Sequence, residues 1–309
     1  MTRVLVVAAI IAVATAVGIL AEPRLPGGGR PLARGLTRAL LWGVMPILYF
    51  CAVARLHLTA GVGVGLVFAY VETAAAGLLA WLIAARVLRL PRPGVGAVVV
   101  CVVVVNTGYV GLPLTTALLG GGQLPFAIAW DSAVSAPMLL IVAMSIGAAL
   151  GTRGAATRGG QLRALLLNPP LWGVVAGLLA PTALAPAVLD DISHTLVYVL
   201  IPFGFFVVGL SLGNESEEGS LTFPPALSAP VLTVLGLRLL VAPTLLVALA
   251  LLVHDVPDAY LLQAAMPCGA NAVLVAHLYG LDLKITSSAV AWSTMLVLVA
   301  AVVASPFVV

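Results

Sequence analysis

Long apolar stretches, separated by short groups of polar, glycine and proline residues, make up almost the whole chain. Ten such stretches can be delimited, at residues 4–21, 39–54, 60–85, 94–120, 124–150, 166–186, 192–213, 228–253, 259–280 and 285–308. A helix needs about 20 mostly apolar residues to cross the hydrocarbon core of a bilayer. The pattern therefore predicts an all-α integral membrane protein with ten transmembrane helices.

The composition fits a lipid environment. Of the 309 residues, 62% are hydrophobic and 8% are charged, and the mean hydropathy is +1.20, which excludes an ordinary soluble globular protein. The net charge of +3 comes from basic residues in the gaps between apolar stretches, so we expect them to meet the membrane surface and not nucleic acid. The three cysteines lie inside apolar stretches without metal-site spacing, and we expect neither a resident metal nor a cofactor.

Basic residues divide unequally between the two sides of the predicted arrangement. With the N-terminus outside, eleven fall on the inner side, whereas Arg3 and Arg55 fall on the outer side. Because inner loops of membrane proteins are rich in lysine and arginine, we expect both termini on the outer side of the cell membrane. The arginines that follow residues 4–21 also argue against a cleaved signal peptide, because they keep the segment after the first span on the cytoplasmic side.

The two halves of the chain repeat each other in order. The segment LLWGVMPILYF of the second stretch aligns with LVYVLIPFGFF of the seventh and superposes Pro46 on Pro202. Likewise, AIAWDS of the fifth stretch aligns with AVAWST of the tenth and superposes Asp131 on Ser293. A unit with an odd number of spans inserts in opposite orientations in its two copies, and such inverted repeats are typical of secondary transporters.

These matches predict the domain organisation. We expect a first five-span repeat at residues 1–150, a cytoplasmic linker at 151–165 and a second, inverted five-span repeat at 166–309.

The fourth and ninth stretches both carry helix-breaking residues at bilayer depth. The fourth contains NTGYVGLPLTTALLG and the ninth QAAMPCGANAVLVAHLYG. Proline and glycine free backbone groups that lipid cannot satisfy, so we expect these two breaks to line a binding site. Half-helix N-termini and amide side chains can receive a carboxylate there. The predicted substrate-binding residues are Asn106, Thr107, Gly111, Pro113, Pro267, Gly269 and Asn271. The alternative is that the prolines and glycines only kink two packed helices.

Three charged residues lie near the middle of predicted spans. These are Glu72, Asp131 and Arg238, and charges in membrane helices are costly and usually functional. We expect Asp131 or Glu72 to carry a coupling proton, or to bind Na⁺ near Asp131, and Arg238 to attract the substrate or balance a carboxylate. The alternative is a permanent structural pair of Arg238 with Glu72 or Asp131.

Three segments carry a family resemblance. NTGYVGLPLTTALLG resembles the fourth-span motif of the auxin efflux carrier family, MPCGANAVLVAHLYGLD is similar to its ninth-span motif, and NPPLWGVVAGLLAP is similar to the start of its second repeat. That family is part of the superfamily related to the bile acid–sodium symporters. The likeness runs in order over essentially the whole chain, but the long central loop of the plant members is missing.

The resemblance implies two inverted five-helix repeats in which the broken helices 4 and 9 cross. Spans 1, 2, 6 and 7 would form a scaffold that is often dimeric, and spans 3–5 and 8–10 a transport domain that moves like an elevator. Family substrates are organic anions, including indole-3-acetate and malonate. By position, Asn106, Pro113, Pro267 and Asn271 take the crossover roles.

Together these features predict a non-enzymatic secondary transporter of small organic anions, working in the lipid bilayer as a homodimer. The alternatives are a sodium-coupled symporter of the bile-acid type, a membrane sensor that binds without translocating, a channel and an intramembrane enzyme. The segment GVGVG at residues 61–65 lacks dinucleotide-binding spacing, and no HExxH motif occurs in the chain.

Overall fold

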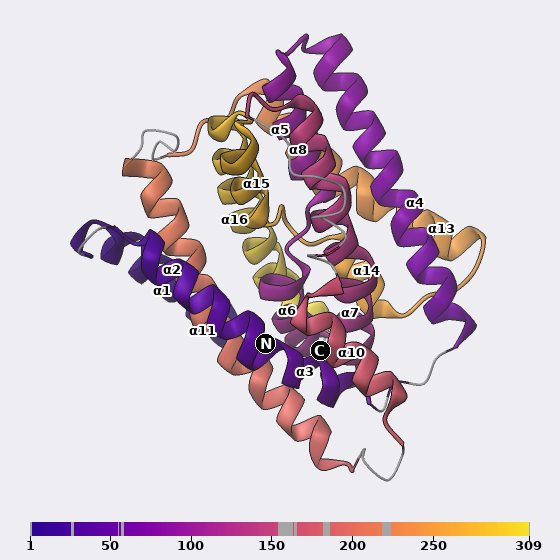
Figure 1. Ribbon diagram of the computed structural model, residues 1–309. Coiled ribbons are helices and arrows are strands. Elements are labelled where there is room, and N and C mark those ends of the chain that lie inside the picture. The colour runs from indigo at the N-terminus through magenta and orange to yellow at the C-terminus, as the bar shows by residue number, and fades with distance from the viewer. Residues whose placement is uncertain are drawn as a thin grey trace.

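The computed structural model describes residues 2–25, 28–54, 56, 59–153, 163, 166–181, 186–217 and 224–308. Over these residues the chain is built of helices (Figure 1). The α-helices are α1 (Thr2–Ala21), α2 (Arg30–Ala39), α3 (Met45–Val53), α4 (Ala60–Leu82), α5 (Arg92–Val103), α6 (Leu112–Leu118), α7 (Leu124–Trp130), α8 (Met144–Leu150), α10 (Pro169–Leu179), α11 (Val188–Glu217), α12 (Ala229–Gly236), α13 (Ala242–Leu252), α14 (Asp258–Ala264), α15 (Asn271–Tyr279) and α16 (Leu283–Val308).

Wider π-helical turns join or extend several of these helices. They are η2 (Leu40–Val44), η3 (Ile83–Val87), η4 (Thr107–Gly111), η6 (Asp131–Ser135), η7 (Met138–Ala143) and η9 (Leu237–Val241). Single π turns inside helices are rare and are frequent at functional sites. Here η4 contains Thr107 and Gly111, and η6 begins at Asp131, all of which the sequence singles out.

Seven helical stretches of the described chain are long and apolar enough to cross a membrane. They are Leu5–Arg24, Arg30–Val53, Ala60–Val87, Gly121–Leu150, Val188–Asn214, Ala229–Leu252 and Leu283–Ala304. Each overlaps one predicted apolar stretch, and the second begins at Arg30, nine residues before its predicted start at 39. The sixth predicted stretch contains a shorter apolar helix, α10, while the fourth and ninth are each divided in two. The all-α prediction is confirmed, whereas the ten-span inverted repeat stays a prediction.

Helix α5 occupies the centre of the molecule. Every residue from Gly94 to Val103 is buried, and the helix contacts α4, α8, α12, α15 and α16. A helix that is apolar on all sides is stable only when other helices surround it. This enclosure explains why α5, although short, is one of the best-packed elements, and it fixes the place where the fourth stretch breaks.

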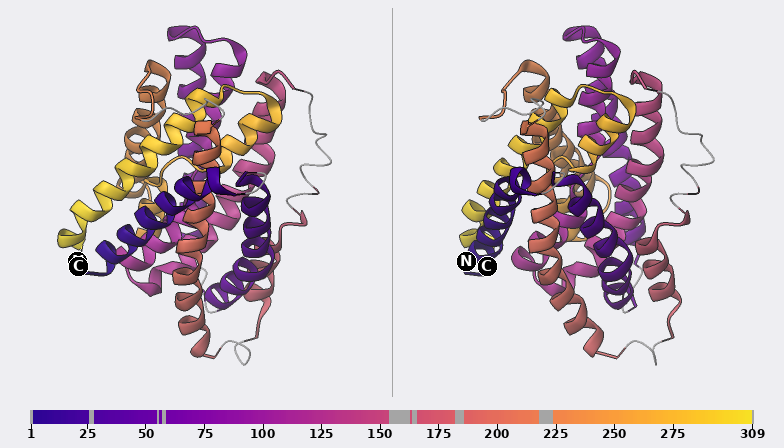
Figure 2. Two further views of the ribbon diagram at one scale, coloured as in Figure 1. Left: turned by 90° about the vertical axis from the view of Figure 1, so that its left-hand side faces the viewer. Right: turned by 60° about the vertical axis from the view of Figure 1, so that its left-hand side comes forward.

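A second group of helices packs beside this centre. Helix α1 lies along α11, and α10 lies along α3 (Figures 1 and 2). A Cβ atom added at Gly18 of α1 would lie 2.8 Å from the Cα atom of Gly209 in α11, so the two backbones meet at glycine, as in many membrane helix pairs. Helices α1 and α16 bring the two ends of the chain to the same end of the molecule (Figure 2).

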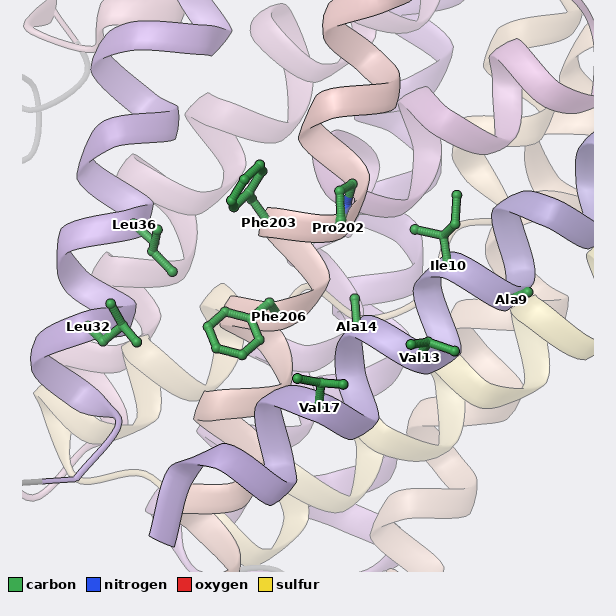
Figure 3. A pocket seen from close by; sticks show the side chains of 10 residues that line it. All are labelled: Ala9, Ile10, Val13, Ala14, Val17, Leu32, Leu36, Pro202, Phe203 and Phe206. Atoms are coloured by element: carbon green, nitrogen blue, oxygen red, sulfur yellow. The ribbon is translucent and has the colours of Figure 1, made fainter. Parts of the chain in front are cut away.

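An apolar groove of about 700 Å³ runs over α1, α2 and α11 (Figure 3). Its lining side chains, such as Val13, Leu36 and Phe203, are all apolar. Such a surface suits lipid chains and offers no hydrogen bonds to a polar ligand. This groove is therefore not a site for a polar ligand.

Candidate functional site

The breaks in the fourth and ninth stretches meet each other. An isolated antiparallel bridge joins Val105 to Cys268. Around it, the N–H of Asn106 donates to the carbonyl of Pro267 at 2.9 Å, and the N–H of Gly269 donates to that of Val104 at 2.8 Å. Backbone groups that each helix gives up are thus satisfied by the other break, which removes the penalty that lipid would impose.

The first break begins where α5 ends, at Val103, and passes through extended backbone to η4. Pro113 has no N–H to donate, and the helix directly before it is widened into the π turn η4. The N–H of Gly111 reaches the carbonyl of Asn106 at 3.1 Å. The side chain of Asn106 is 4% exposed, and its Nδ2 has no hydrogen-bond partner in the described part of the chain.

The second break lies between the end of α14, at Ala264, and the start of α15, at Asn271. A Cβ atom at Gly269 would lie 2.9 Å from Cγ1 of Val104 and 3.2 Å from the carbonyl oxygen of Val105. The close backbone approach at the bridge therefore favours glycine. The N–H of Cys268 donates to Oγ of Ser293 in α16 at 3.1 Å, which anchors the second break to its neighbour.

Asp131, the first residue of η6, is held by two hydroxyl groups. Thr107 donates to its Oδ1, and Tyr49 of α3 donates to its Oδ2. The hydroxyl oxygens of Ser132 and Ser135 are buried beside it without a partner among the described residues. The carboxyl group thus connects the first break with α3.

A cavity of about 400 Å³ opens at this crossing. It lies within the size range of pockets that bind small molecules. Asn106, Asn271 and Asp131 all line it. Other polar lining groups come from Thr37, Tyr49, Tyr109, Ser132, Ser135 and Asn168. Among the described lining residues Asp131 is the one charged side chain, and apolar side chains such as Leu139 and Leu171 complete the wall.

Comparisons with known proteins show similarity to membrane transporters. Residues 158–305 match a family described as membrane transport protein. An uncharacterized transporter from Methanothermobacter thermautotrophicus is 25% identical over 281 residues, which cover 88% of this chain and 87% of that protein. The resemblance to the auxin efflux carrier family is confirmed. Together with the seven helices of the described residues that are long and apolar enough to cross a membrane, this similarity indicates a multi-pass membrane protein.

The predicted binding residues of the transporter separate into two groups. Asn106, Gly269 and Asn271 line the cavity. The others lie behind its wall and shape it, and they are Thr107, Gly111, Pro113 and Pro267. Of these, Gly111 packs so closely on Gln263 of α14 that an added Cβ would collide with the amide.

Glu72 and Arg238 of the transporter lie outside the cavity. Their side chains are fully buried, and Nη2 of Arg238 lies 3.9 Å from Oε1 of Glu72. Nη1 of Arg238 also donates to the carbonyl of Val102 at 3.2 Å, and Nη2 donates to that of Ala264. Of the two partners considered from the sequence, Glu72 is the one that pairs with Arg238.

Sequence reasoning missed several lining residues, above all Tyr49 and Asn168. Tyr49 lies in the segment LLWGVMPILYF, which the internal repeat brings out, and Asn168 opens the family-like segment NPPLWGV. In both segments, a polar residue in an otherwise apolar motif could have marked a candidate lining residue. It could not show that α3 and α10 border the cavity.

Proposed function

We propose that this protein is a secondary transporter that moves small organic anions, carboxylates in the first place, across the cell membrane by alternating access. The observation that carries the proposal is the cavity at the crossing of two broken helices, lined by Asn106, Asn271 and Asp131. Helix breaks that cross near the middle of a membrane protein are typical of substrate sites in secondary transporters.

The chemistry of the cavity suits a carboxylate. Helix α15 begins at Asn271 on the cavity wall, and the N–H groups of a first helical turn carry a partial positive charge. Nδ2 of Asn106, which has no partner among the described residues, and the hydroxyls of Ser132 and Ser135 add hydrogen-bond donors. Apolar wall residues would contact the carbon skeleton of the substrate.

We further propose two inverted five-span repeats whose helices form a scaffold and a moving transport domain. The breaks pair with each other in an antiparallel bridge, and Glu72 of the third predicted span meets Arg238 of the eighth, which is compatible with pseudo-symmetry. One wall of the cavity comes from α3 and α10 and the other from the breaks and η6. A boundary of this kind would allow an elevator movement, with both termini outside and the scaffold helices forming a homodimer.

Asp131 is the proposed coupling residue. An ionised Asp131 and a bound carboxylate would share one cavity of about 400 Å³ that has no cationic side chain among its described lining residues. Like charges at such short range in a poorly hydrated site repel strongly. Substrate binding would therefore require a cation on Asp131, either a proton or Na⁺.

The proposal is tested with purified protein in liposomes. A thermal-shift screen of mono- and dicarboxylates selects a ligand, and uptake of that labelled ligand measures transport. Asn106→Ala and Asn271→Ala should each remove most of the uptake, while Asn214→Ala, the same change in α11 away from the cavity, should leave it intact. Uptake unaffected by both cavity substitutions would refute the site. Binding without uptake would indicate a sensor, and chemical conversion of the ligand an enzyme.

A further inference from the structure

The carbonyl ends of the two broken helices converge behind the cavity. The last four carbonyl groups of a helix have no partner within it and carry a partial negative charge. Near the ends of α5 and α14, backbone N–H groups satisfy several of them. These are the carbonyls of Val100, Leu262 and Gln263, reached at 2.9, 3.0 and 3.2 Å.

A single guanidinium group accounts for two more of these carbonyl groups. Arg238, in η9, donates from Nη1 to the carbonyl of Val102 near the end of α5, and from Nη2 to the carbonyl of Ala264 at the end of α14. Its side chain is fully buried, and Glu72, also fully buried, lies 3.9 Å away. A buried charge is tolerable only when its surroundings compensate it, and here two helix ends and one carboxylate do so.

We propose that Arg238 is the resident cation of the crossing, and that it takes the place that a metal cation would otherwise have at the two carbonyl ends. This inference rests on the proposed transport function. In transporters with broken helices, unwound carbonyls and half-helix C-termini are the groups that coordinate a coupling Na⁺. In this protein the carbonyls of Val102 and Ala264 and the carboxylate of Glu72 already face a guanidinium.

The balance of charge between Arg238 and Glu72 leaves the coupling role to Asp131. The positive charge of Arg238 and the negative charge of Glu72 cancel within one buried cluster, so neither has to change during transport. Asp131 is then the one variable charge among the described residues of the cavity. The transporter consequently works without Na⁺, and the cation that accompanies the substrate is the proton on Asp131.

Ion replacement tests the proposal on the wild-type protein. Uptake of the carboxylate into liposomes is measured in sodium chloride and in N-methylglucamine chloride at equal ionic strength. The two rates should be the same. A loss of about tenfold or more without Na⁺, the size of a normal coupling between two ligands, would overturn the proposal.

Two variants distinguish a cation from a packing element. Arg238→Lys keeps the charge and should retain measurable, Na⁺-independent uptake. Arg238→Met combined with Glu72→Gln keeps the volume and removes both charges. It should lower uptake about tenfold or more, because two helix ends lose their cation. Wild-type uptake by this double variant would show that Arg238 only fills space and would overturn the proposal.

Arg238→Ala provides a readout that does not depend on transport. It leaves a space bordered by two carbonyls and the Glu72 carboxylate. Millimolar guanidinium should raise the thermal unfolding temperature of this variant and leave the wild type unchanged. The absence of any rescue by guanidinium or Na⁺ in folded Arg238→Ala would overturn the cation role. If the wild type transports no carboxylate in either salt, the transport proposal fails, and guanidinium rescue still decides the role of Arg238.

Discussion

Asp131 supports the first break through Thr107, whereas Ser293 supports the second through the N–H of Cys268 at 3.1 Å. These two residues occupy matching places in AIAWDS and AVAWST. Asp131 borders the cavity and is partly accessible, while Ser293 is fully buried. Equivalent positions thus contribute an ionisable group on one side of the crossing and a neutral hydroxyl on the other.

The difference shows where a charge can vary. A carboxyl group at bilayer depth is expensive and is retained mainly where it has a role, whereas a buried hydroxyl costs little once it is hydrogen-bonded. The second break is therefore held by a fixed interaction. The first is held by one that a proton can change, and the substrate reaches the same group.

The largest effect is expected from removing the crossing itself. Gly269→Ala would place a Cβ 3.2 Å from the carbonyl oxygen of Val105, which as backbone cannot rotate away. Both breaks should lose their register, with uptake abolished and a loss of about 1–3 kcal/mol in the free energy of unfolding. Gly63→Ala in α4, where an added Cβ meets nothing within 4 Å, is the matched control for flux and thermal unfolding. Equal behaviour of the two variants would contradict a crossing that needs glycine.

The second prediction removes the variable charge. Asp131→Asn keeps the size of the side chain and one of the two acceptor oxygens that receive Tyr49 and Thr107, but it cannot be ionised. Uptake against a concentration gradient should be lost, while exchange of internal for external substrate should persist, because exchange needs no net movement of protons. Asp191→Asn, in the exposed first turn of α11, should transport like the wild type. Proton-driven accumulation by Asp131→Asn would show that the carboxyl group is structural.

The third prediction concerns the link between Asp131 and α3. Tyr49→Phe keeps the ring and deletes one hydrogen bond to the carboxyl group. A single hydrogen bond to a charged or polar group contributes about 0.5–3 kcal/mol, so we expect a several-fold change in the uptake rate with little loss of stability. Tyr198→Phe, with 41% of the residue exposed on α11, is the control. Unchanged kinetics would mean that α3 does not help to set the state of Asp131.

Sequence patterns could predict the helices and the breaks, because both depend on local rules. The apolar stretches gave the class of protein, and Pro113, Gly269 and the two asparagines marked the breaks, since lipid tolerates such residues only where protein satisfies the backbone. That the two breaks satisfy each other's backbone groups agrees with the same rule, but the pairing of Asn106 with Pro267 is known from the structure.

Partners from distant segments could not be predicted in this way. Arg238 could have paired with Glu72 or Asp131, and helical periodicity does not fix the rotation of a span that is apolar on every side. The role of Tyr49 depends on the packing of α3 against η6. Nothing in the local sequence shows that one guanidinium would reach the ends of both α5 and α14.

The smallest and sharpest test compares the two supports directly. Thr107→Val and Ser293→Ala each delete one hydroxyl. Thr107→Val loses one hydrogen bond and should cost about 1 kcal/mol of stability. Ser293→Ala loses two, one from the N–H of Cys268 and one to the carbonyl of Val290, and should cost about 2 kcal/mol. Their effects on transport should differ. Thr107→Val removes a donor from the carboxyl group that carries the proton, so the dependence of uptake on pH should change. Ser293→Ala disturbs only the neutral support, so the pH profile should keep its shape even if the rate falls. If both substitutions altered the pH profile equally, the two breaks would respond as one unit. The difference between Asp131 and Ser293 would then not affect transport.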